Sequence, residues 1–253
     1  MLSLFLWLAG MLFEFLLLVR SVQTKTFTKY FYFYAYIFCV FTVSATLYIG
    51  RSASPQFYEA WYWPTQFATL AMGCGVVLEI VRQSLATYPG AERIARLASC
   101  AVFIVTFCYV EWHVASRSEW STVAATVELE RDLRVIEALV LATVLAIVFY
   151  YRIELGKNVT GMILGFGAYV GVSLTTLALR SFVGPRFDTA WGLLQSASFL
   201  FGTAVWTVAL WSYSPNPKPP TSGRSGGGYE ALVHGTRAQL ESVRSNLRGV
   251  AGS

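Results

Sequence analysis

Two glutamates of this chain lie within long apolar stretches, where an ionised side chain is costly. Glu14 belongs to a stretch over residues 2–19, and Glu79 ends another over residues 63–81, three residues before Arg82. Charged groups in hydrocarbon usually face protein or water and mark functional sites. Residues three apart share a helix face, so Glu79 and Arg82 can pair. The sequence predicts either a structural ion pair beside a protonated, hydrogen-bonded Glu14, or a proton- or ligand-linked site of all three in the inner half of the membrane.

A second set of polar residues comes from four different apolar stretches and is expected in the outer half of the membrane. Its members are Glu111, His113, Glu137, Arg180 and Gln195. If these side chains converge, they line an outward-facing polar pocket. The alternative is that they are unrelated residues at helix ends, whose polar tips reach the membrane surface.

No motif predicts a catalytic centre, a metal site or a cofactor. The only histidines, His113 and His234, are expected on opposite sides of the membrane, which excludes a histidine cluster. The sequence has neither a GxSxG motif nor a P-loop, and the last apolar stretch has no lysine to form a retinal Schiff base. The four cysteines lack ligand-like spacing and are expected to be buried free thiols.

The residues above must be positioned by the apolar stretches that contain them. The number of these stretches indicates the class of protein. Of 253 residues, 55% are hydrophobic and only 13% charged, and the mean hydropathy is +0.53. A helix of about 20 apolar residues crosses a bilayer. The sequence predicts an all-α integral membrane protein, a bundle of seven transmembrane helices at about residues 2–19, 31–49, 63–81, 95–114, 135–151, 159–179 and 190–211.

The fifth and sixth stretches carry further signals. The fifth is short for a span, and we expect it to extend outward as helix from about Val123, supported by an i,i+4 pair of Glu130 and Arg134. The sixth has two frames of small residues at i,i+4 spacing, which let helix backbones approach closely. These frames predict a central helix in the bundle; the alternatives are a dimer seam or a sliding helix. The frames are Gly161 with Gly165 and Gly167 with Gly171.

The distribution of Lys and Arg predicts the orientation. They are more frequent in the loops on the side of the C-terminal tail, and several on the other side stand beside acids. Because cytoplasmic loops are enriched in Lys and Arg, the N-terminus is predicted outside and the C-terminus inside. The net charge of +5 is therefore attributed to the basic residues of the cytoplasmic loops and tail. Nucleic acid is not an expected partner.

The tail is predicted to differ from the bundle. Residues 1–212 form the membrane domain, and residues 213–228, rich in Pro, Gly and Ser, are predicted to be a disordered linker. Residues 229–253 repeat apolar positions at helical spacing with Arg residues off that stripe, which predicts a basic amphipathic cytoplasmic helix. It either lies on the anionic inner leaflet or forms a short coiled coil with a protein partner.

Four short segments resemble a bacterial family of seven-helix membrane proteins with no known activity. They are FYFYAY from Phe31, LEIVR from Leu78 with Tyr88-Pro89, LERDLR from Leu129 and GMILGFG from Gly161. The resemblance covers about residues 25–212 and implies seven helices in a bacterial inner membrane. It implies no activity.

The sequence favours a non-enzymatic membrane module, a sensor or an organiser of partner proteins, whose output is carried by the tail helix. The alternative is a transporter of small solutes or lipids that uses Glu14 and Glu79. An intramembrane enzyme is the third hypothesis.

The orientation can be tested with single cysteines introduced at Ser54 and Ser222 after the native cysteines are replaced. An impermeant thiol reagent added to intact cells is expected to label position 54 and not position 222, because only the first is predicted outside. Labelling of position 222 in unbroken cells contradicts the predicted orientation.

Overall fold

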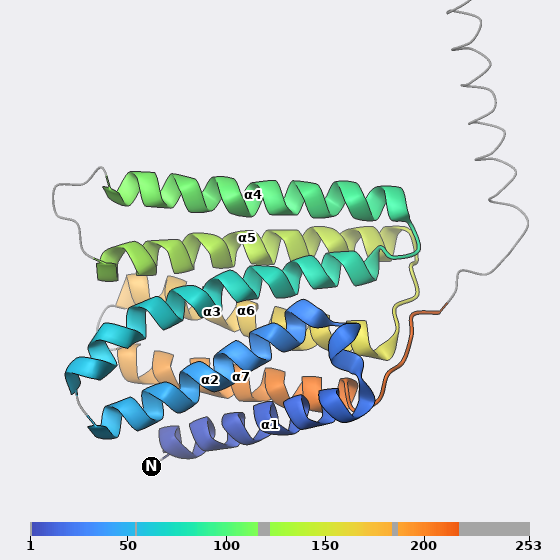
Figure 1. Cartoon of the computed structure of the whole chain (residues 1–253). Coiled ribbons are helices and arrows are strands. Elements are labelled where there is room, and N and C mark those ends of the chain that lie inside the picture. Colours follow the sequence, from blue (N-terminus) through green and yellow to red (C-terminus); the bar gives the residue numbers. More distant parts are fainter. Residues whose placement is uncertain (1, 54, 116–121, 184–186, 218–253) are drawn as a thin grey trace, which may run out of the picture. The chain divides into compact units, whose positions relative to one another are not determined.

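The structure is a computed structural model, and it describes residues 2–53, 55–115, 122–183 and 187–217 (Figure 1). The described residues are helical, with no strand among them. The helices are α1 (Leu2–Thr24), the 3-10 helix η1 (Thr26–Thr28), α2 (Phe31–Ala53), α3 (Pro55–Ser84), α4 (Pro89–Ala115), α5 (Thr122–Tyr150), α6 (Lys157–Val183) and α7 (Asp188–Ala209).

Six of these helices are long and apolar enough to cross a membrane, which agrees with a multi-pass membrane protein. They are α1, α2, α3, α5, α6 and α7. The predicted fourth span is not among them. Its helix, α4, carries Glu92, Arg93 and Arg96 in its first two turns, and several side chains at its other end lie outside the described residues. Seven helices are therefore present in the described chain, while seven spans remain a prediction.

Two helices begin earlier than their apolar stretches. The predicted extension of α5 from about Val123 is confirmed, since the helix begins at Thr122. Helix α3 begins at Pro55 rather than near residue 63 and contains Pro64 within it. Apolar composition marks the part of a helix that faces hydrocarbon, whereas the backbone hydrogen bonds continue beyond it.

The helices alternate in direction, so the bundle has two ends (Figure 1). We call the end at which α1 begins the start end, and the end at which α1 turns into α2 the turn end. Lys25 and Arg152, each just after a helix at the turn end, adopt the left-handed conformation, with φ of 55° and 51°. That conformation ends helices and reverses the chain.

The tightest packing joins α6 and α7. A Cβ atom added at Gly161 would stand 2.0 Å from the Cβ of Ala209, and one at Gly165 would stand 2.3 Å from Nε1 of Trp206. Nothing lies within 4 Å of a Cβ at Gly167 or Gly171. Only the first of the two predicted glycine frames therefore brings described helices together.

Helix α4 lies at the edge of the bundle (Figure 1). Among the described elements it packs against α3 and α5. Much of its surface is apolar and exposed, including Ile94, Val105 and Trp112. These side chains face whatever surrounds the bundle.

The structure describes the first residues of the chain after α7. Residues 211–217, which we call the strap, include the start of the predicted linker. Asn158 of α6 donates to the carbonyls of Ala209 and Ser212 and accepts from the amide of Ser214. Asn216 accepts from the amide of Gly156 and donates to the carbonyl of Gln83. Asparagine side chains thus satisfy backbone hydrogen-bonding groups in and beside the strap. Residues 218–253, with the rest of the predicted linker and the tail helix, lie outside the described residues.

The close contact of α6 and α7 predicts unequal effects for two glycines of α6. Gly161→Ala is expected to lower the free energy of unfolding by about 1–3 kcal/mol, because the new methyl group meets a Cβ fixed to the backbone of α7. Gly167→Ala is the matched control and is expected to be neutral or stabilising by up to about 1 kcal/mol, since alanine favours helix. Reversible unfolding in mixed micelles measures both. Equal losses would contradict this packing.

Candidate functional site

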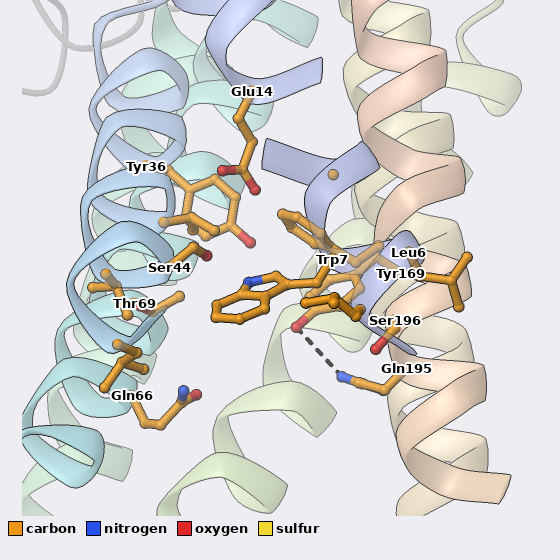
Figure 2. Close-up of a pocket in the computed structure, with 16 residues that line it drawn as sticks. Leu6, Trp7, Glu14, Tyr36, Ser44, Gln66, Thr69, Tyr169, Gln195 and Ser196 are labelled. Atoms are coloured by element: carbon orange, nitrogen blue, oxygen red, sulfur yellow. Dashed lines mark hydrogen bonds between the residues drawn. The ribbon is translucent and has the colours of Figure 1, made fainter. Parts of the chain in front are cut away.

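A cavity of about 430 Å³ lies among five helices in the half of the bundle toward the start end. Helices α1, α2, α3, α6 and α7 contribute its walls, and Figure 2 shows how the labelled side chains point inward. The polar lining residues are Glu14, Tyr36, Ser44, Gln66, Thr69, Tyr169, Gln195 and Ser196. The volume falls in the range of roughly 300–1,000 Å³ that is usual for small-molecule sites.

Among the described residues that line this cavity, Glu14 alone is charged. Its side chain is 1% exposed, and its Oε2 atom has no hydrogen-bond partner among the described residues. Figure 2 shows its carboxyl group pointing into the cavity beside the ring of Tyr36. A buried carboxylate without a partner costs several kcal/mol, and natural proteins usually pair such groups. The carboxyl group therefore faces the cavity with one oxygen whose hydrogen-bonding capacity is unmet by the described residues.

A buried polar network supports the wall of the cavity from α5. Arg134 Nη1 lies 2.9 Å from Glu137 Oε2, with both side chains buried. Its Nη2 donates to the hydroxyl of Tyr169 at 3.1 Å, and its guanidinium carbon lies 4.8 Å from the centre of the Tyr169 ring. The amide of Gln195 in turn donates to Tyr169 at 3.4 Å and to Ser173 at 3.2 Å. Charge on α5 is thus neutralised locally, and Tyr169 and Gln195 carry the network to the cavity.

Aromatic rings fill the space between the cavity and the turn end. Tyr169 lies 5.6 Å from Phe199, which lies 6.3 Å from Trp206, measured between ring centres. Tyr36 lies 6.4 Å and Phe33 5.2 Å from the same tryptophan. Edge-to-face rings at these distances attract one another beyond the area that they bury. A closely packed aromatic cluster centred on Trp206 therefore borders the cavity on the side of the turn end.

A separate polar cluster lies near the turn end around Glu79. The carboxyl group of Glu79 is fully buried, and it accepts from Arg82 at 2.6 Å and from Gln83 at 2.8 Å. Arg82 and Gln83 also donate to the carbonyl of Lys29, which ties α3 to the α1–α2 connection. Tyr30, in that connection, is buried nearby, and its burial raises the pKa of the phenol above its usual value. This cluster is fully partnered and lines none of the cavity.

The structure regroups the residues that the sequence selected. Glu79 and Arg82 pair as predicted from their spacing, but Glu14 does not join them and instead lines the cavity. Glu137 and Gln195 belong to one network through Arg134 and Tyr169. The side chains of the other three residues of the proposed outer pocket, Glu111, His113 and Arg180, lie outside the described part of the structure.

Sequence reasoning missed Arg134, Tyr36 and Tyr169. Arg134 was predicted to pair with Glu130, four residues earlier, whereas its ion pair is made with Glu137. Arg134 and Glu137 are three residues apart, like Glu79 and Arg82, so the same spacing could have predicted their ion pair. The two tyrosines gave no signal, because a tyrosine in an apolar helix is as common in a core as in a binding site.

The cysteines also differ from their prediction. All four are free, but Cys108 is exposed and the other three are half-buried. The reason is that several apolar faces of the bundle point outward rather than into a core. No group of three or more His, Cys, Asp or Glu side chains that could hold a metal occurs among the described residues.

Comparison with known proteins finds no match: no family model, no curated protein and no solved structure is similar to this chain.

Removing one partner of the buried pair is expected to destabilise the protein strongly. Glu137→Gln should lower the free energy of unfolding by about 3–5 kcal/mol, because Arg134 then remains buried without its counter-charge. The matched control is Asp132→Asn in the exposed pair with Arg131, which should cost less than about 1 kcal/mol. Unfolding in mixed micelles, followed by tryptophan fluorescence, compares them. Similar losses in the two variants would show that burial does not govern the Arg134 pair.

Proposed function

We propose that this protein is a membrane-embedded sensor that binds a small ligand in the cavity and reports its presence through the strap. The observation that carries this proposal is the carboxyl group of Glu14, which is buried and unpartnered in a cavity of about 430 Å³. Convergent polar groups in a largely apolar pocket are typical of small-molecule sites.

Helix α7 supports a link between cavity and strap, because it belongs to both. It supplies Gln195, Ser196 and Phe199 to the cavity, and it ends at Ala209, directly before the strap. Between these points, Trp206 packs against Phe199 and donates to the carbonyl of Met162 at 3.5 Å. A ligand that moves Phe199 therefore acts on the contact that sets the position of α7 against α6.

The strap is a suitable output element because it is not a helix and is held to the bundle by individual side-chain hydrogen bonds. Asn158 and Asn216 provide its hydrogen bonds to α6 and α3, and Arg20 donates to the carbonyl of Trp211 at 2.9 Å. A ligand shifts such an element only if it binds one arrangement of the bundle better than the other. In our proposal the ligand-bound arrangement alters these bonds, and the chain after Pro217 carries the signal.

The predicted location completes the proposal. We place the protein in a bacterial inner membrane, with α4 as a seventh span, the cavity in the outer half and the strap on the cytoplasmic side. The distribution of Lys and Arg and the family resemblance support this placement. The partners that the proposal requires are the bilayer and a cytoplasmic protein.

A covalent occupant of the cavity tests the coupling without knowledge of the ligand. In a chain whose native cysteines are replaced by alanine, Ser44→Cys is modified with a benzyl thiosulfonate reagent, which fills the cavity. Amide hydrogen exchange in residues 211–217 is expected to change at least threefold on modification, because the packing of Phe199 on Trp206 is disturbed.

The control is Thr42→Cys, modified in the same way. Thr42 is on the same helix as Ser44, but it is exposed and does not line the cavity. Exchange in the strap should stay unchanged there. If both modified variants exchange alike, the cavity does not communicate with the strap and the sensor proposal fails.

A transporter of small solutes is the second candidate. Two buried carboxyl groups favour it, Glu14 facing the cavity and Glu79 near the turn end. Proton-coupled uptake into proteoliposomes that Glu79→Gln abolishes would place transport ahead of sensing, since the sensor proposal gives Glu79 only a structural role.

A further inference from the structure

The charges that face the cavity select the kind of ligand. Of the described residues that line it, Glu14 is acidic and none is basic. Arg134 lies behind Tyr169, is not among the lining residues, and is neutralised by Glu137. An anionic ligand would therefore meet only the like charge of an ionised Glu14, whereas a singly charged cation would neutralise it.

Hydrogen-bonding capacity points the same way. Two buried atoms on lining residues have no partner among the described residues, Oε2 of Glu14 and Oε1 of Gln195. When Glu14 is ionised, both atoms are acceptors, so a ligand that satisfies them must donate. A carboxylate that accepts from a charged donor makes a bond roughly twice as strong as a neutral pair. An N–H-bearing cation meets both requirements, whereas a quaternary ammonium ion meets only the requirement of charge.

The aromatic residues of the cavity suit the same ligand. Trp7, Tyr36, Tyr169 and Phe199 line it, and Figure 2 shows the indole of Trp7 lying across its centre. Trp7 is held in place by an edge-to-face contact with Tyr48 at 5.2 Å. Aromatic rings attract organic cations by about 0.5–2 kcal/mol each and also bury the apolar part of an amine.

We infer that the cavity binds a small organic ammonium ion with an apolar body, its N–H groups donating to Glu14. This inference rests on the proposed function, because it names the ligand of the same cavity. Glu14 supplies the charge and the acceptor, and the aromatic residues supply the contact for the apolar body.

Isothermal titration of the full chain in nanodiscs tests the inference with three probes that share a phenethyl body. They are phenethylamine, which is cationic and donates N–H; phenethyltrimethylammonium, which is cationic without N–H; and 2-phenylethanol, which is neutral. Empty nanodiscs correct for partition into lipid. We expect the amine to bind at least tenfold more tightly than the alcohol, with the trimethylammonium ion between them.

Two substitutions localise the binding. Glu14→Gln should weaken binding of the amine at least tenfold and leave binding of the alcohol within about threefold, since the isosteric amide removes only the charge. Glu154→Gln, at an exposed residue beyond α5, is the matched control and should change neither. Ser44→Trp keeps Glu14 and should abolish amine binding by filling the cavity, whereas Thr42→Trp should not.

The outcomes separate this inference from the proposed function. Equal affinities for amine and alcohol, or amine binding that survives both Glu14→Gln and Ser44→Trp, overturn the ammonium site. Absence of binding by the amine also overturns it. In each of these cases the strap exchange experiment still decides the proposed function, because its occupant is attached covalently and needs no affinity.

Discussion

The close approach of α6 to α7 is the contact on which the other features depend. Gly161 and Gly165 admit Ala209 and Trp206 of α7 to the backbone of α6, where no side chain could fit. In a membrane the hydrophobic effect does not drive helices together, so this packing must supply the association itself. It sets the distance of Gln195 from Tyr169 at the cavity. It also brings the end of α7 to Asn158, which holds the strap.

Among the described residues, three glutamates are buried, and they differ in how the protein offsets the cost of their burial. Glu137 and Glu79 each accept from an arginine three residues away and from further donors, so both are satisfied within the described structure. Glu14 has no such arginine on α1, where the nearest is Arg20 at the turn end, bonded to the strap. Glu14 thus differs from the other two in facing a cavity, with one carboxyl oxygen that has no hydrogen-bond partner among the described residues.

Much of the fold could be predicted from the sequence, because a run of about 20 apolar residues leaves the chain no alternative to a helix in a membrane. Helix rotation could not be predicted. Glu14 and Glu79 were grouped by depth, yet α1 turns Glu14 toward α2 and α7, and this depends on packing. The pairing of Arg134 with Glu137 could have been predicted, because residues three apart share a helix face. The positions of Tyr36 and Tyr169 at the cavity could not, because they depend on the packing of helices far apart in the sequence. Composition gave no sign of the hydrogen bonds that Asn158 and Asn216 make at the strap, because these bonds join residues far apart in the sequence.

The position of α4 at the edge of the bundle bears on the thickness of the surrounding bilayer. A membrane around the other helices also meets α4, because α4 lies along α3 and α5. Between Arg96 and Glu111 its sequence is uncharged only over residues 97–110, which corresponds to about 21 Å of helix. This is shorter than a hydrocarbon core of about 30 Å. Where α4 crosses the bilayer as the predicted seventh span, the lipid beside it must thin, or the ends of α4 must reach the headgroups. Helix α7, which packs against α6 and α1, has a candidate span of 20 residues, about 30 Å long, and fits without adjustment. Such a bundle presents a short hydrophobic face and a long one, and it favours lipids of different chain length beside the two.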